Sequence, residues 1–194
     1  ISMSLDGFAA GPKDEVDRIF QWYFSGDTEF TFPGTEMAFK VSPASAEHMR
    51  QGSRGIGAIV TGRRNFDLAQ AWGGHPPLGV PHFVVTHRPL QEWMKEGSPF
   101  TFVTGGVPSA VEKAKAAAGG KDIAVSSPNV MRQCLQAGLL DDINIDLVPL
   151  LLGRGVRLFE EIGIEPVELE LAAVVEGQGV THLRYAIPKG SVKR

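Results

Sequence analysis

Four short apolar runs, each closed by small or polar residues, restrict the architectures open to this chain. The runs are Ile56–Val60, Pro81–Val85, Phe100–Val103 and Ile123–Val125. Apolar runs of this length, bounded by turn residues, are typical of strands buried on both faces, as in parallel sheets. Segments with a helical pattern alternate with these runs, at Phe66–Ala71, Ser109–Ala118 and Val130–Ala137. This alternation predicts an α/β fold around a mostly parallel sheet.

The last third of the chain changes to a period of two. Apolar and polar residues alternate along Ile143–Leu147, Val167–Leu171 and Thr181–Ile187, and Glu176–Gly179 reads as a hairpin turn before the last of them. Period two predicts half-exposed strands, here antiparallel ones. No linker or change of composition separates the two parts. We therefore expect one three-layer α/β domain over residues 1–190, with antiparallel C-terminal strands, and a short tail at 191–194.

Serine and glycine mark the expected helix ends. Ser45 is the expected N-cap of a short helix that Gly52 stops. Ser109, with Glu112 three residues later, predicts a capping box at the start of the next clear helix.

The long segment Gly7–Ser42 is rich in aromatic and turn residues. A segment of that length without periodicity is typical of an ordered functional loop.

Composition excludes several classes of protein. The chain of 194 residues has a net charge of -3 and 43% hydrophobic residues, which excludes a disordered chain. No long basic block is present, so we do not expect a nucleic-acid partner. No apolar run approaches a membrane span, and no leader pattern begins the sequence. The single Cys134 excludes an internal disulfide framework and indicates a reducing compartment, so we expect a cytoplasmic protein without membrane association.

Polar and basic residues follow three of the apolar runs. These segments are Thr61-Gly62-Arg63-Arg64, Thr86-His87-Arg88 and Ser126-Ser127-Pro128-Asn129. Ligands of open α/β sheets bind at the carboxyl ends of the strands, where helix N-termini favour phosphate. Arginine binds phosphate through two hydrogen bonds, so the pattern predicts a site for a phosphorylated ligand. The alternatives are that the arginines are solvated surface residues and that the serines and Asn129 only cap a helix.

Several better-known site patterns are absent. The sequence has neither a Walker P-loop nor a G-x-G-x-x-G after a strand, so an ordinary Rossmann site is not expected. The five histidines, at positions 48, 75, 82, 87 and 182, do not have the spacing of metal ligands, and no metal is expected.

The order of motifs resembles the dihydrofolate reductase superfamily, in its riboflavin-type branch. That branch is the C-terminal reductase domain of bifunctional riboflavin-biosynthesis deaminase-reductases and their stand-alone relatives. The matching segments are Ser2–Gly11 (SMSLDGFAAG), Val60–Phe66 (VTGRRNF), Val84–Pro89 (VVTHRP) and Ala137–Phe159 (AGLLDDINIDLVPLLLGRGVRLF). The first and last of these are specific, and the resemblance covers nearly the whole chain.

The resemblance implies an NADPH-dependent reductase that passes hydride to a pteridine-like or pyrimidine-like heterocycle. By motif matching, Thr61, Gly62, Arg63 and Arg64 would hold the cofactor phosphates, and Thr86, His87 and Arg88 the 2′-phosphate side of the adenosine. Ser126, Ser127, Asn129 and Val130 would cover the pyrophosphate and nicotinamide, and Gln133 would contact the adenine region. The family also implies a homodimer formed through the closing strands.

One segment departs from the family pattern. The family usually has a Gly-Gly pair at the start of the last helix, where backbone approaches the pyrophosphate without a Cβ. Here the segment is Ser126-Ser127-Pro128-Asn129, and Pro128 has no N–H donor. The alternative reading is therefore a nucleotide-binding relative with weakened or no reductase activity.

Three residues are candidates for the substrate side. Trp22, in the aromatic Gly7–Ser42 segment, would stack on a flat heterocycle or pack in the core. Asp6, in the opening motif, and Glu47, on the helix that carries a carboxylate in folate reductases, are the candidate catalytic carboxylates. Either would accept hydrogen bonds from an amino-pyrimidine edge as an ionised group. Asp6 has a turn-forming alternative and Glu47 a surface alternative, and neither the proton donor nor the physiological substrate follows from the sequence.

Overall fold

The computed structural model describes residues 1–192, and the chain forms two compact units within it. Unit 1 comprises Ile1–Phe30, Ala38–Arg50 and the chain from Gly138 onward, and unit 2 comprises Thr31–Met37 and Gln51–Ala137. The single domain over residues 1–190 and the tail at 191–194 stay predictions, and residues 193 and 194 of that tail lie outside the described residues.

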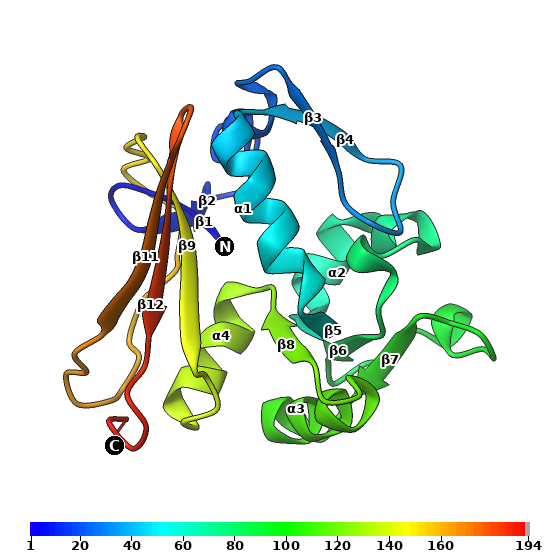
Figure 1. Ribbon diagram of the computed structural model, residues 1–194. Helices are drawn as coiled ribbons and strands as arrows, with labels where there is room; N and C mark the ends of the chain where they lie inside the picture. The colour runs from blue at the N-terminus through cyan, green and yellow to red at the C-terminus, as the bar shows by residue number, and fades with distance from the viewer. Residues whose placement is uncertain (193–194) are drawn as a thin grey trace. The chain divides into compact units, whose positions relative to one another are not determined.

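Unit 2 is built on a parallel sheet of four strands. The strand order is β7-β6-β5-β8, and all three pairings are parallel (Figure 1). The strands are β5 (Ile56–Gly62), β6 (His82–Val85), β7 (Phe100–Val103) and β8 (Asp122–Val125). All four predicted strands are present. β5 and β6 are buried as expected, with Val60 and Val84 completely inaccessible to solvent. The expected burial is wrong for β8, whose apolar residues Ile123–Val125 are only half-buried at the edge of the sheet, and β7 exposes Thr101.

Three α-helices alternate with these strands. They are α2 (Arg63–Leu68), α3 (Gly106–Ala117) and α4 (Pro128–Gln136), and the connections contain the 3₁₀ helices η2 (Gln70–Gly74), η3 (Pro77–Gly79) and η4 (Gln91–Trp93). The predicted capping box at Ser109 is wrong, because α3 begins three residues earlier. Only Thr104 and Gly105 separate the helix from β7, and Gly106 turns the chain into the helix with φ +82°, a backbone conformation that glycine adopts at low cost.

Unit 1 is built on a mixed sheet of four strands in the order β1-β9-β12-β11. The strands are β1 (Ser2–Ser4), β9 (Asp142–Val148), β11 (Glu170–Gly177) and β12 (Val180–Ala186). β1 is parallel to β9, whereas β9, β12 and β11 are antiparallel neighbours, side by side in Figure 1. The predicted strand at Val167–Leu171 begins later, at Glu170, because Glu170 already pairs with Ala186, the last residue of β12.

The rest of unit 1 includes one long helix and two small sheets. α1 (Pro43–Arg54) runs into unit 2 with its last residues, and η1 (Gln21–Phe24) lies in the aromatic segment. The small sheets pair β2 (Phe8–Ala10) with β10 (Val156–Arg157) and β3 (Thr28–Thr31) with β4 (Ala38–Val41). The Gly7–Ser42 segment therefore contains regular elements.

The predicted ends of α1 are both wrong. Ser42, not Ser45, caps the helix, because the Ser42 Oγ accepts a hydrogen bond from the Ser45 backbone N–H at 3.2 Å. The helix also continues through Gly52, a position where a side chain would meet nothing within 4 Å. An exposed glycine lowers helix stability by about 1 kcal/mol relative to alanine, which does not suffice to end a helix held by packing.

The predicted mixed α/β class, with parallel strands followed by antiparallel C-terminal strands, is confirmed. One central sheet was predicted. In the described residues, the hydrogen bonds instead form two four-stranded sheets, one in each unit. No helix among residues 1–192 has the length and hydropathy needed to cross a bilayer. A cytoplasmic location stays a prediction.

Candidate cofactor site

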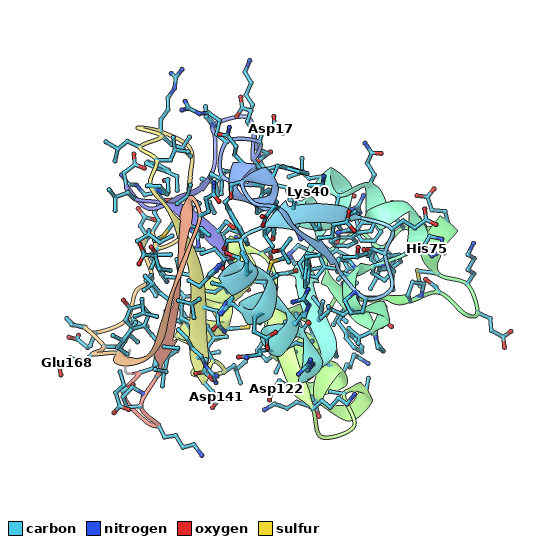
Figure 2. All side chains as sticks on the ribbon, turned by 45° about the horizontal axis from the view of Figure 1, so that its top comes forward. Asp17, Lys40, His75, Asp122, Asp141 and Glu168 are labelled. Carbon is cyan, nitrogen blue, oxygen red and sulfur yellow. The ribbon has the colours of Figure 1, made fainter. Side chains whose placement is uncertain are left out.

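Unit 2 brings the three polar strand ends to one edge of its sheet. β5, β6 and β8 are parallel, so the residues that follow them lie at the same edge. These are the predicted segments Thr61–Arg64, Thr86–Arg88 and Ser126–Val130. Asp122, labelled in Figure 2, marks the opposite, amino end of β8. The elements expected to hold a phosphorylated ligand are therefore neighbours.

Gly62 and Ser127 form the closest contact of this edge. The Gly62 backbone N–H donates to the Ser127 Oγ at 3.0 Å. A Cβ on residue 62 would lie 3.1 Å from that oxygen and 3.4 Å from the Val130 side chain, so glycine permits the close approach of β5 to α4. The Ser127 hydroxyl does not cap α4. It therefore leaves the first-turn N–H groups of Asn129 and Val130 without a capping bond from this side chain.

Ser126 supplies an unsatisfied polar group at the same edge. Its Oγ is buried and has no hydrogen-bond partner among the described residues. A buried hydroxyl without a partner costs about 1–3 kcal/mol, and a ligand oxygen would satisfy it. Together with the start of α4, this hydroxyl fits an anionic group such as a pyrophosphate. Pro128, at the first position of α4, removes one donor from that set.

Arg63 is engaged within the protein. Its Nε donates to the two carboxylate oxygens of Asp67 at 2.7 and 2.9 Å, and its Nη1 donates to the Arg88 carbonyl at 2.6 Å. This guanidinium therefore ties the end of β5 to the end of β6. Thr61 is similarly occupied, since its buried Oγ1 accepts from the Asn65 Nδ2 at 3.0 Å. Both residues position the edge, and their predicted phosphate contacts stay predictions. Arg64 is exposed at the start of α2.

Arg88 has a fixed backbone and an available side chain. Its N–H donates to the Thr86 Oγ1 at 3.1 Å, and its carbonyl accepts from Arg63 and, at 3.3 Å, from Thr86. Its exposed guanidinium has no hydrogen-bond or ion-pair partner in the described part of the chain. His87, beside it, is also exposed. A positively charged group on a rigid backbone suits an anion such as a phosphate monoester.

On α4, the Gln133 Nε2 donates to the Asn129 Oδ1. Both side chains are exposed and one helical turn apart. This bond holds the Gln133 side-chain amide on the exposed face of the first turns of α4. The predicted contact of Gln133 with an adenine ring stays a prediction.

Sequence reasoning missed the residues that fix the end of β5, and also the bond that joins it to the end of β6. Asn65 binds Thr61 and Asp67 binds Arg63, in each case four residues along the chain. This i,i+4 spacing is the signal for neighbours on a helix face, and it was present in the sequence. The bond from Arg63 to the Arg88 carbonyl had no such signal, because it joins residues 25 positions apart.

Asp6, a predicted catalytic carboxylate, lies in unit 1 and accepts three hydrogen bonds. The donors are the Ser4 hydroxyl at 2.6 Å and the backbone N–H groups of Leu152 at 3.1 Å and Gly153 at 2.7 Å. These bonds, that of Ser4 first, lower the pKa of Asp6 from 3.8 to about 2. The carboxylate is thus ionised near neutral pH and connects the opening turn to the loop after β9.

We expect acid to weaken this connection. The pKa of Asp6 in the folded protein lies below its ordinary value, so its stabilising contribution is complete above about pH 4 and is lost as the pH falls towards 2. The free energy of unfolding, measured with urea, should therefore fall less steeply over that range in Asp6→Asn than in the native chain. Asp17→Asn, at an exposed carboxylate (Figure 2), controls for the lost charge. Equal slopes in the Asp6 variant and the native chain would contradict this account.

The other two substrate-side candidates occupy different environments in unit 1. Glu47 is exposed on α1, with an oxygen 3.9 Å from the Arg50 Nη1. Trp22 is only 3% exposed, and its Nε1 donates to the Ser2 Oγ at 3.2 Å. Its ring packs against Tyr23 and His182, which is the core packing that the sequence also allowed. The substrate roles of Asp6, Glu47 and Trp22 stay predictions.

Comparison with known proteins gives a family and a fold. Residues 1–183 match the family model described as RibD C-terminal domain. No curated protein matches the chain. Among solved structures, a putative riboflavin biosynthesis protein from Shewanella sp. PV-4 is 20% identical with a TM-score of 0.70, over 100% of this chain and 97% of that one.

Two further structures show the same fold. A diaminohydroxyphosphoribosylaminopyrimidine deaminase/5-amino-6-(5-phosphoribosylamino)uracil reductase from Thermotoga maritima is 8% identical with a TM-score of 0.58, over 96% of this chain but only 54% of that one. A pyrimidine reductase-like protein from Corynebacterium diphtheriae is 15% identical with a TM-score of 0.53, over 96% and 89%. The chain thus spans about half the length of the bifunctional enzyme. It belongs to the RibD C-terminal domain family and has the dihydrofolate reductase-like fold.

Proposed function

We propose that this protein is an NADPH-dependent reductase that transfers hydride to a pyrimidine- or pteridine-type heterocycle. The observation that carries the proposal is the edge of the parallel sheet in unit 2. There, the partnerless Ser126 hydroxyl and the uncapped start of α4 follow β8, and the exposed Arg88 guanidinium follows β6, the strand on the other side of β5. Three groups that favour anions suit a ligand with more than one phosphate.

Each part of the edge has a distinct task under this proposal. Ser126 and the N–H groups of Asn129 and Val130 would hold the pyrophosphate, and Gly62 would let backbone approach it. Arg88 would bind the 2′-phosphate, which NADPH has and NADH lacks. Bound there, the nicotinamide would supply the hydride, while the protein orients it and excludes water. Because Pro128 has no backbone N–H, the start of α4 offers the pyrophosphate one hydrogen-bond donor fewer than another residue there would.

The family supports the substrate class. Two proteins of similar fold are described as a deaminase/5-amino-6-(5-phosphoribosylamino)uracil reductase and a pyrimidine reductase-like protein, so we propose a pyrimidine-like acceptor before a pteridine. The ionised Asp6 and the exposed Glu47 are the proposed acceptors for the amino edge of such a ring. Trp22 is proposed to support the ring from the core.

Binding and turnover separate this proposal from its alternative. Titration of the purified chain, followed by tryptophan fluorescence, should show saturable NADPH binding and at least about tenfold weaker NADH binding, the equivalent of one charge-assisted hydrogen bond. NADPH oxidation should then accelerate with an aminopyrimidine or dihydropteridine acceptor. Binding of NADPH without turnover of any acceptor would favour the nucleotide-binding relative. Absence of NADPH binding would exclude the NADPH-dependent reductase.

We also propose a homodimer through β11. This strand is the edge of the unit 1 sheet, and its side chains Leu171 and Val174 are 59% and 53% exposed. An exposed apolar edge strand is a typical pairing surface. Light scattering of the native chain at micromolar concentration should give twice the chain mass, and Leu171→Lys with Val174→Lys should give the monomer mass. A monomeric native chain would contradict the proposal.

A further inference from the structure

A row of three polar side chains crosses the sheet of unit 1. Ser2 on β1, Asp146 on β9 and His182 on β12 are direct cross-strand partners, so they project from the same face. Two residues of α1, Ser45 and His48, contact this row. They are three residues apart and therefore share one side of the helix. All five residues belong to unit 1, and the predicted cofactor residues do not include them.

Hydrogen bonds connect this row in one direction. The His182 Nδ1 lies 2.7 Å from the Asp146 Oδ1, and the Ser45 Oγ lies 2.9 Å from the His182 Nε2. The Ser42 Oγ in turn donates to the Ser45 Oγ at 3.0 Å. With an ionised Asp146, Nδ1 of a neutral His182 carries the proton and Nε2 accepts from Ser45. His182 itself is 1% exposed, and its bond to Ser45 is buried, whereas the bonds at the two ends of the chain are partly buried.

His48 completes the group and differs from the others in having no hydrogen bond. Its ring stacks on that of His182 with a centroid distance of 4.3 Å, and neither of its nitrogens has a hydrogen-bond partner among the described residues. The side chain is half-buried. A neutral imidazole at this position offers a nitrogen lone pair that no hydrogen bond of the described residues occupies.

We propose that His48, Asp146 and His182 form a binding site for a divalent transition-metal ion, with Zn²⁺ the best fit. Their ligand atoms all lie within 4.8 Å of one another. Two imidazoles and one carboxylate are the ligand types that Zn²⁺ accepts, with a water in the fourth position. The tetrahedral ion requires ligand atoms about 3.3 Å apart, so the half-buried His48 ring has to turn out of its stack to point a nitrogen at the ion.

The ion can take the place of the His182 Nδ1 proton, because that proton can move to the other ring nitrogen and keep a hydrogen-bond partner there. The ion takes the position of the proton between the His182 Nδ1 and the Asp146 Oδ1. That proton is transferred to Nε2, which then donates to the Ser45 Oγ. Ser45 reverses its own bond to donate to Ser42, and the partly buried Ser42 turns its own hydroxyl proton towards solvent. No proton is released overall when His48 is neutral. Without metal, Asp146, His182 and Ser45 satisfy one another through the bonds described above, so their hydrogen bonding does not depend on the ion.

The surrounding residues form the second layer that metal sites use to orient their ligands. Ser45 holds the second nitrogen of His182, and the Ser2 Oγ lies 3.4 Å from the Asp146 Oδ2, which leaves Oδ1 for the ion. The Trp22 Nε1 binds Ser2 in turn. Such outer partners change metal affinity by roughly 10–100-fold.

Metal titration of the full chain tests this site without any nicotinamide cofactor. The purified protein is treated with a chelator, dialysed and titrated with Zn²⁺ in a calorimeter, and Co²⁺ absorption spectra report the coordination geometry. We expect one ion per chain with tetrahedral-type Co²⁺ bands. His48→Ala and Asp146→Asn should each weaken Zn²⁺ binding at least about 100-fold, and Ser45→Ala about tenfold. Zn²⁺ should raise the unfolding temperature of the native chain and not that of His48→Ala.

The matched control is His75→Ala, which removes an exposed histidine of unit 2 (Figure 2). This variant should bind Zn²⁺ as the native chain does. His48 is half-buried and Asp146 keeps its shape as asparagine, and circular dichroism of each variant confirms that a loss of binding is not a loss of fold. The proposal is overturned if the native chain takes up no ion, or if His48→Ala and His75→Ala bind it equally. Failure here leaves the reductase proposal untouched, because none of the three proposed metal ligands is a proposed cofactor-binding or substrate-binding residue.

Discussion

Gly155→Ala is expected to lower the free energy of unfolding by about 3 kcal/mol or more, at the upper end of the range for overpacking. Gly155 has φ +149°, and a Cβ there would lie 2.0 Å from the Ala10 carbonyl oxygen and 3.0 Å from the Gly11 Cα. These are backbone atoms of β2 and the residue after it. The pairing of Ala10 with Val156 fixes these atoms. Since they belong to the backbone and not to a flexible side chain, they cannot move away from the added methyl group without disturbing that pairing.

Gly153→Ala, two residues earlier, is the matched control. It has φ +75° but nothing within 4 Å of a Cβ, so alanine there should cost only the conformational term of about 1–2 kcal/mol. Urea denaturation of both variants then separates the steric term from the backbone term. Equal losses in the two variants would show that β10 and β2 are not closely paired in solution.

The strands that form the cofactor edge could be predicted because their signal is local. A run such as Ile56–Val60 is apolar throughout and bounded by glycine, and burial on both faces of a parallel sheet imposes that composition. The helix starts could not be placed as well. Ser42 and Ser45 are equivalent capping residues in sequence, and only the bond from the Ser45 N–H to the Ser42 hydroxyl distinguishes them.

The predicted site shows the same division between local and distant signals. Polar residues after each strand identified Arg88 and Ser126, because parallel strands place them at one edge. The bond from Arg63 to the Arg88 carbonyl could not be predicted. It depends on the distance between two loops, and that distance does not follow from the residue types. His48, Asp146 and His182 were missed for a related reason. Histidine spacing was read along the chain, whereas cross-strand register joins Asp146 to His182.

Arg88→Ala is expected to raise the dissociation constant for NADPH by about 10–100-fold and to leave that for NADH within about twofold. A charge-assisted bond from guanidinium to phosphate contributes about 1.5–3 kcal/mol, and only NADPH carries the 2′-phosphate that Arg88 would bind. The backbone at residue 88 should stay in place in the variant. Its N–H and carbonyl are held by Thr86 and Arg63, and neither bond involves the Arg88 side chain.

Two further variants make the result specific. Arg54→Ala removes an exposed arginine from unit 2 outside the predicted site, and should change neither affinity by more than about twofold if long-range charge is screened. Arg63→Ala releases the Arg88 carbonyl and the end of β6, so it should weaken NADPH and NADH together. If Arg88→Ala weakened both cofactors equally, Arg88 would be maintaining the edge as Arg63 does, and the 2′-phosphate would have to be recognised by Arg64 or His87.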